Sequence, residues 1–117
     1  VGAGIEDSFL NDWGLEGVDR EYFKQLVQGI LKYTTELDRV LEKCLDRDLA
    51  SVDPIERTVL RIGTYELQFR PEIPVRVVLN EAIELARVFG AEEGYRFVNG
   101  VLDRCQKLCR GSELPIA

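Results

Sequence analysis

Residues 74–104, PVRVVLNEAIELARVFGAEEGYRFVNGVLDR, decide the fold, because they contain two helical patterns separated by a joint with glycine. In both patterns the apolar residues fall three and four apart, which is the spacing of an amphipathic helix. Pro74 suits the start of the first helix, and Gly90 suits the C′ position after its end. The second helix is predicted to run from about residue 92 to residue 110.

The block upstream, DPIERTVLRIGTYEL at residues 53–67, has a strong helix start signal. Asp53 suits the N-cap, Pro54 the first helical position and Glu56 the third, where its side chain can complete a capping box. This helix is predicted to end near Phe69, before a proline. Its apolar residues surround much of the helix axis, which indicates a central position in the core.

Two further helical registers precede this block, one from residue 19 and one from about Thr35. Thr35 and Asp38 have the spacing of a capping box, and the pattern leaves open whether these registers are two helices or one bent helix. No alternation typical of strands occurs, so the predicted class is all-α. We divide the chain into an acidic, glycine-rich lead (1–18), a helical domain (19–110) and a tail (111–117).

The length of 117 residues indicates one domain with one core. No apolar run approaches the roughly 20 residues that a membrane span needs, and no signal sequence opens the chain, so we expect a cytoplasmic protein without a membrane contact. Three cysteines fall within helical patterns and are expected to be buried, reduced thiols. Because the chain lacks histidine and C-x-x-C, we expect no metal site and no cofactor.

The formal charge of -6 is unlike that of a typical nucleic-acid-binding domain, but it is unevenly distributed. Residues 1–19 hold five acids and no base, which leaves 15 bases against 16 acids in the remainder. Residues 94–110 hold four bases and one acid. These charges fit a local basic face, and they fit an ordinary solvated helix equally well.

An enzymatic function has little support in the sequence. Without histidine, acid-base catalysis would depend on other groups, and no phosphate-binding loop, dinucleotide-binding or hydrolase motif is present. The paired acids at residues 92–93 and the acids flanking Arg47 lie in turn or helix-end settings, where such residues usually cap helices or face water. We therefore expect a binding protein.

The motifs I-E-R-x-V-L-R (55–61), N-E-A-I-E-L-A (80–86) and F-V-N-G-V-L-D (97–103) resemble the NusB family of bacterial transcription antitermination factors. The resemblance runs from about residue 22 to residue 110. It implies a helical bundle of two small orthogonal units, which acts within an antitermination complex in ribosomal RNA synthesis. It also implies two partners: boxA-type single-stranded RNA and NusE, a ribosomal protein of the small subunit.

One part of the family pattern is missing from this chain. Members of the family usually begin with an arginine-rich first helix, which contributes RNA contacts and part of the core, whereas this chain opens on its acidic lead. We expect an exposed apolar groove where that helix would lie. Such a groove would favour a homodimer or capture of another segment.

Four residues are candidates for RNA binding. A helical wheel places Phe97 at the border of the apolar stripe, next to Gly100 and Arg104, where an aromatic ring can be half-exposed. Phe97 matches the aromatic residue that the family associates with its RNA-binding surface, and unpaired bases commonly stack on such rings. Arg76 and Arg96 lie on the polar sides of their helices and match basic positions of the family, so we expect them to flank Phe97. Packing at the core edge for Phe97 and surface ion pairs for the arginines remain the alternatives.

Two acids are candidates for partner binding. Glu56 matches a position that the family associates with NusE, although helix capping already explains it. The wheel neighbours of Glu81 are apolar, so we expect a buried carboxylate paired with an arginine of the preceding helix such as Arg61. A place in a partner surface is the alternative for Glu81.

Two other functions compete with antitermination. NusB-like domains also form the N-terminal part of ribosomal RNA cytosine methyltransferases, and a following α/β domain with a G-x-G motif would identify that case. A protein-interaction bundle without RNA binding is favoured by the acidic net charge.

Overall fold

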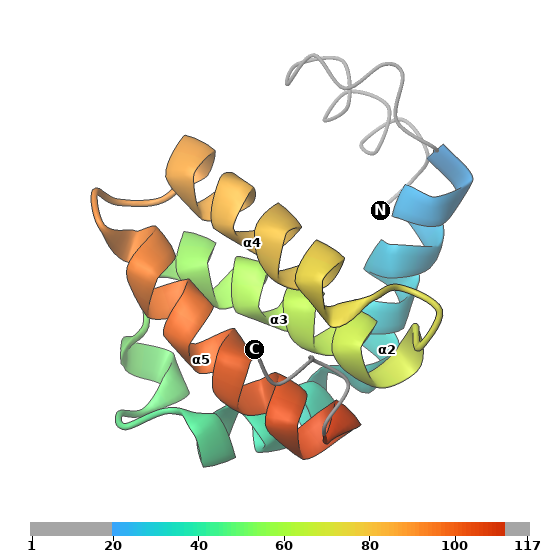
Figure 1. Ribbon diagram of the computed structural model, residues 1–117, viewed down its shortest axis with the longest axis horizontal. Coiled ribbons are helices and arrows are strands. Elements are labelled where there is room, and N and C mark those ends of the chain that lie inside the picture. Colours follow the sequence, from blue (N-terminus) through green and yellow to red (C-terminus); the bar gives the residue numbers. More distant parts are fainter. Residues whose placement is uncertain (1–19, 112–117) are drawn as a thin grey trace.

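The computed structural model describes residues 20–111, in which every regular element is helical. The elements are α2 (Arg20–Cys44), the 3-10 turn η1 (Leu49–Ser51), α3 (Pro54–Phe69), α4 (Val75–Phe89) and α5 (Gly94–Arg110). α3 lies in the middle of the bundle and contacts the other three long helices, and α4 and α5 run antiparallel beside each other (Figure 1). The all-α class predicted from the sequence is confirmed.

The acidic lead at residues 1–18, with its apolar cluster at residues 9–15, lies outside the described residues, as does the tail beyond residue 111. The domain boundaries proposed from the sequence therefore stay a prediction. Among the described helices, none combines the length and the apolar character that crossing a bilayer requires.

α3 begins as its sequence predicts. The Asp53 side chain accepts hydrogen bonds from the amides of the second and third helical residues, at 3.0 and 3.2 Å, and Pro54 occupies the first helical position. Midway along α3, Gly63 lets Leu102 of α5 approach closely, since an added Cβ would lie 2.7 Å from the Leu102 Cδ1 atom. This close contact confirms α3 as the central helix.

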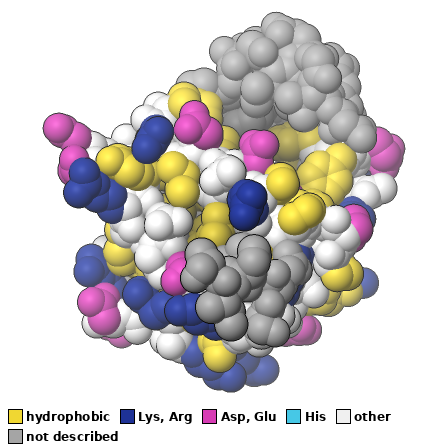
Figure 2. All heavy atoms as spheres, viewed as in Figure 1, with side chains coloured by type: hydrophobic (Ala, Val, Ile, Leu, Met, Phe, Trp, Pro, Cys, Tyr) yellow, Lys and Arg dark blue, Asp and Glu magenta, His cyan; other side chains and the backbone are white. Residues whose placement is uncertain are grey.

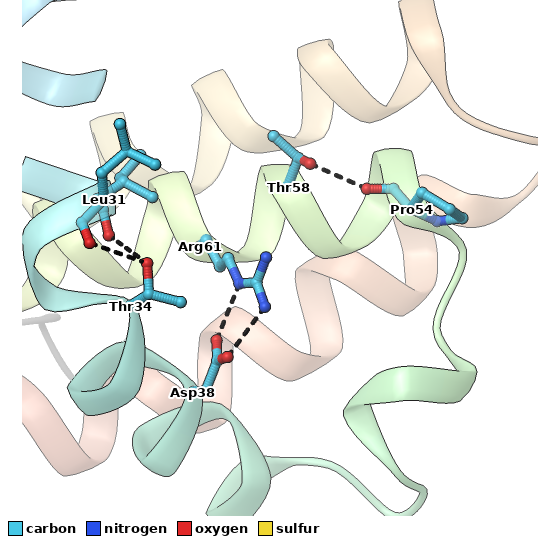
Figure 3. A network of polar contacts seen from close by, with 7 residues as sticks. Leu31, Thr34, Asp38, Pro54, Thr58 and Arg61 are labelled. Atoms are coloured by element: carbon cyan, nitrogen blue, oxygen red, sulfur yellow. Dashed lines mark hydrogen bonds and ion pairs between the residues drawn. The ribbon is translucent and has the colours of Figure 1, made fainter. Parts of the chain in front are cut away.

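α2 is one helix with a kink at Tyr33, whose φ of -109° and ψ of 18° are not helical. A side-chain hydrogen bond accompanies the kink: the Thr34 hydroxyl donates to the Ile30 carbonyl, one turn earlier, at 2.6 Å (Figure 3). The Tyr33 ring stacks on Phe69 of α3, with 4.4 Å between ring centroids. The two registers of the sequence are therefore two helical segments that meet at a kink within α2.

The predicted capping box of Thr35 and Asp38 is not formed, because among the described residues no hydrogen bond joins either side chain to the start of the helical segment after Tyr33. The Asp38 carboxylate instead accepts two hydrogen bonds from Arg61 of α3, from Nε to Oδ1 and from Nη2 to Oδ2, each at 2.9 Å (Figure 3). This two-point ion pair joins α2, just beyond its kink, to the middle of α3.

The core has two parts. The main cluster lies between the second half of α2 and the three later helices, and its fully buried members include Leu41, Leu60, Val98 and Leu102. A smaller cluster around Leu26, Leu37 and Tyr65 packs α2, on both sides of its kink, onto α3. Each such aliphatic side chain contributes about 1.5–3 kcal/mol through burial.

The cysteines behave as the sequence predicted for buried thiols. Cys44 and Cys105 are free and buried in the main cluster, and Cys109 is free and half-buried. Burial raises the pKa of the Cys105 thiol, so the group stays protonated at neutral pH. Among the described residues, no cluster of three or more cysteine and carboxylate groups is arranged to hold a metal.

Arg110 fastens the end of α5 to the end of α3. Its guanidinium donates to the carbonyl groups of Leu67 at 2.8 Å, Glu66 at 2.8 Å and Arg70 at 2.7 Å, and also to that of Ile73. These are carbonyls of the last turn of α3 and the following connection, and two of them also accept backbone amides: Glu66 from Arg70 at 3.1 Å and Arg70 from Ile73 at 3.0 Å. The positive charge of Arg110 thus adds hydrogen bonds at the C-terminal end of the central helix, where the helix dipole is negative.

The joint between α4 and α5 differs from the expected one. α4 ends at Phe89 as predicted, but Gly90 has an extended backbone with a φ of -92°, not the left-handed C′ conformation. The residue with positive φ is Glu93, at 70°, and α5 begins at Gly94. Gly90 is nevertheless needed for space, because an added Cβ would lie 2.7 Å from the Ala86 carbonyl oxygen.

Candidate nucleic-acid interface

Phe97 is half-buried on α5, at the edge of the main core cluster, as the helical wheel predicted. Its ring is paired with the guanidinium of Arg47, which lies 4.7 Å from the ring centroid. Arg47 comes from the connection after α2, fifty residues earlier in the chain. In the sequence Arg47 belongs only to a helix-end segment, and its place over an aromatic ring follows from the tertiary fold.

Arg104 lies one turn beyond Gly100 on the same side of α5. Its Nε donates to the Cys44 carbonyl at 2.8 Å. This hydrogen bond caps the end of α2 and holds the guanidinium group of Arg104 in place. Arg47 and Arg104 both interact with Asp46. A hydrogen bond from Arg47 lowers the pKa of Asp46, and the positive charges of both arginines lower it further. An aromatic ring and two guanidinium groups therefore converge where the end of α2 meets α5.

The space-filling view agrees with this arrangement. On the face shown in Figure 2, basic side chains gather along the lower left, over α5 and the connection between α2 and α3, with acidic side chains among them. Basic side chains are thus gathered on this part of the surface, together with acidic ones, on a chain whose formal charge is -6.

The other two predicted arginines do not both reach this cluster. Arg96 precedes Phe97 and is exposed, where it forms an ion pair with Glu93 at 2.7 Å. Arg76 is exposed in the first turn of α4, whereas Phe97 is in the first turn of α5, which runs antiparallel to α4 (Figure 1). The structure therefore brings together Phe97, Arg104 and Arg47, with Arg96 next to them, and places Arg76 at the other end.

Glu56 is buried at the start of α3, with its carboxylate against Gly94, the first residue of α5. Its amide donates to Asp53 as a capping box requires, but among the described residues no hydrogen bond runs back from the Glu56 carboxylate to the Asp53 amide. Burial raises the pKa of Glu56, and the negative charge of Asp53 adds to this effect. The capping box is thus half formed, and the carboxylate sits at the contact between α3 and α5.

Glu81 does not pair with Arg61, so the prediction of a buried ion pair is wrong. Glu81 is exposed on α4, and Arg61 binds Asp38. The wheel had surrounded Glu81 with apolar residues, but two of these, Val77 and Val88, are themselves 44% and 66% exposed. That side of α4 faces outward, where a carboxylate needs no buried partner. A place in a partner surface stays a prediction for Glu81.

An apolar groove of about 510 Å³ lies between the first half of α3 and the second half of α4. Ile55, Ile62, Val88 and Phe89 are among its lining residues, and Ile55 and Val88 are 45% and 66% exposed. Among the described residues an exposed apolar groove is thus present. That it lies where the first helix of the family would pack, as expected from the sequence, stays a prediction.

The sequence pattern of the NusB family matches residues 4–107 of the chain. The protein from Shewanella amazonensis named transcription antitermination protein NusB is 50% identical over 102 residues, which cover 87% of this chain and 76% of that protein. The protein of the same name from Nitrosococcus oceani is 52% identical over 99 residues, covering 85% of this chain and 67% of that protein.

The fold agrees with the sequence. A crystal form of T. maritima NusB superposes with a TM-score of 0.72 at 33% sequence identity, covering 87% of this chain and 81% of that one. A binding protein rather than an enzyme was expected from the motifs, and the antitermination proteins that the chain matches agree with this expectation. By sequence and by fold, the chain belongs to the NusB family of transcription antitermination proteins.

Proposed function

We propose that this chain is an RNA-binding antitermination factor that acts in the cytoplasm on boxA-type single-stranded RNA during ribosomal RNA synthesis, together with NusE in an antitermination complex. The observation that carries the proposal is the cation–π pair of Phe97 and Arg47, with Arg104 interacting with the same neighbouring acid, Asp46. Aromatic rings and guanidinium planes are the groups on which proteins stack unpaired bases. A half-buried ring between two cations suits one base and its flanking phosphates.

The arrangement of charge supports an anionic ligand at this place. Arg47, Arg96 and Arg104 are exposed around the Phe97 position, and Arg104 is held in place by its bond to the Cys44 carbonyl. Asp46 and Glu93 offset part of this charge, through ion pairs at 3.0 Å with Arg47 and 2.7 Å with Arg96. A phosphate would compete with these exposed pairs, each of which contributes little to stability.

The two acidic candidates suit different roles toward NusE. Glu81 is exposed between the exposed side chains of Val77 and Val88, a mixture of charge and apolar surface that fits direct contact with a protein. Glu56 is buried against the start of α5, so we propose that it acts by holding α3 and α5 in register. Its effect on NusE binding would then be indirect.

The experiment that tests the proposal is a titration of the protein with a labelled boxA-like single strand and with the same sequence as a duplex, each with and without NusE. The proposal predicts preference for the single strand and tighter binding when NusE is present. Equal binding of the two forms would contradict base stacking as the mode of recognition. Absence of RNA binding in the presence of NusE would contradict the proposal as a whole.

A further inference from the structure

Four glycines lie inside the described helices, and the packing accounts for three of them. A Cβ added at any of these three would collide with a side chain: that of Tyr65 at Gly29, that of Leu102 at Gly63 and that of Glu56 at Gly94. Each of these glycines therefore permits a contact within the chain.

Gly100 is the exception. A Cβ at this position would have one neighbour within 4 Å, the Nη1 atom of Arg104 at 3.9 Å, which is an ordinary contact. Its φ is not positive, so the backbone does not demand glycine either. A glycine in the interior of a helix is destabilising relative to alanine. Nothing inside the described part of the chain explains the absence of a side chain here.

The side chains around Gly100 are of the kinds that bind a ligand outside the chain. Residues three, four and seven positions away share its side of the helix. These neighbours are Glu93, Arg96, Phe97, Asp103, Arg104 and Lys107. Glu93 is paired with Arg96 at 2.7 Å, and Asp103 with Lys107 at 3.6 Å. Gly100 is thus at the centre of a face with three cations, two acids and an aromatic ring, and an approaching group would meet helix backbone there.

We propose that Gly100 is a contact point for RNA, at which one nucleotide lies flat against the backbone of α5. Its base would then lie beside Phe97, and its phosphate beside Arg104. This inference rests on the proposed function and adds to it a residue whose small size lets the nucleotide approach the helix backbone. A nucleic acid is favoured over a packed protein helix because the neighbours of Gly100 are mostly charged, whereas helices that pack on glycine bury apolar neighbours.

The test compares Gly100→Ala with Asn99→Ala, a change on the adjacent exposed residue, which lies about 100° around the helix from Gly100. Gly100→Ala should raise the melting temperature by about 4 °C, because alanine favours the helix. The same change should weaken binding of a boxA-like single strand about tenfold, because a methyl group overpacks a close contact. Asn99→Ala should leave RNA affinity unchanged.

Increased stability together with weakened RNA binding supports the inference. Increased stability with unchanged RNA binding, in a protein whose binding still depends on Phe97, overturns the inference and leaves the proposed function standing. Unchanged RNA binding with weakened NusE binding assigns Gly100 to a protein contact and also overturns it. A fall in melting temperature would mean that the fold itself requires Gly100. Loss of the proposed function would appear separately, as absence of RNA binding by the parent chain.

Discussion

Arg61 of α3 and Asp38 of α2 meet in a two-point ion pair, with both nitrogen-oxygen distances at 2.9 Å and about a quarter of each side chain exposed. We predict that Asp38→Leu lowers the free energy of unfolding by about 2 kcal/mol, because it leaves the Arg61 charge partly buried without its partner. Urea denaturation of the single variants and of the double variant with Arg61→Leu measures the coupling. Additive effects in that cycle would contradict a direct interaction.

Glu81→Leu provides the contrast. Because Glu81 is exposed and Arg61 has another partner, this change should alter the free energy of unfolding by no more than about 0.5 kcal/mol. If Glu81 belongs to the partner surface, the same variant should lose affinity for NusE. Titration of NusE into a stable Glu81→Leu protein measures this, and unchanged affinity would remove Glu81 from the interface.

We predict that the Glu66 carboxyl makes the free energy of unfolding depend on pH. Burial is the main cause that raises its pKa above the ordinary value of 4.5, the charge of Glu81 adds to the effect, and Tyr22 donates a hydrogen bond to it. Because the folded pKa lies above the unfolded one, the carboxyl favours folding most at pH values below 4.5. This contribution is lost as pH rises through the folded pKa.

Glu66→Gln removes this titration and keeps an oxygen that can accept from Tyr22. The variant should therefore be more stable than the parent at pH 7, and the difference should vanish toward pH 4. Thermal unfolding of both proteins across this range measures it. A variant that is less stable at pH 7 would show that the charged carboxylate is favoured in the fold, contrary to the direction of its pKa. Glu56, whose pKa is also raised, remains in both proteins and does not affect the comparison.

We predict that the apolar groove between α3 and α4 binds an environment-sensitive apolar dye. Val88 is 66% exposed at its edge, so Val88→Lys should reduce dye fluorescence while changing stability by about 0.5 kcal/mol or less. Lys24→Ala, on the exposed side of α2, serves as a control that should leave the dye signal unchanged. Equal dye signals from the parent and the Val88 variant would show that the groove is not accessible in solution.

Arg47 is the residue that the fold adds to the RNA site. Arg47→Ala should weaken binding of a boxA-like strand about tenfold and reduce the slope of log affinity against log salt by about 0.7, if its charge meets a phosphate. Arg39→Ala, which removes an exposed arginine from α2, is the matched control. Equal effects of the two changes would mean that only total charge matters.

The helices could be predicted from sequence because their signals are local. The cap at Asp53 and the border position of Phe97 both follow from residues within one or two turns. The contacts between helices could not be predicted in this way. Arg47 is fifty residues from Phe97, and Asp38 is twenty-three residues from Arg61.

The errors have the same cause. A helical wheel gave the direction of Glu81 correctly, but it cannot say whether another helix covers that direction. Arg76 and Phe97 both lie on polar or border positions, and only the antiparallel course of α4 and α5 separates them. Sequence pattern therefore predicted the position of each side chain on its helix, and the fold determined which positions are covered and which side chains meet.

The central claim is that RNA bases stack at Phe97, and Phe97→Leu tests it most directly. Leucine keeps apolar contact with the core and removes the aromatic ring, so a matched melting temperature separates binding from folding. We predict that the stable variant loses about 1–3 kcal/mol of affinity for a boxA-like single strand, with and without NusE. A folded Phe97→Leu protein that binds the strand as tightly as the parent would contradict this account.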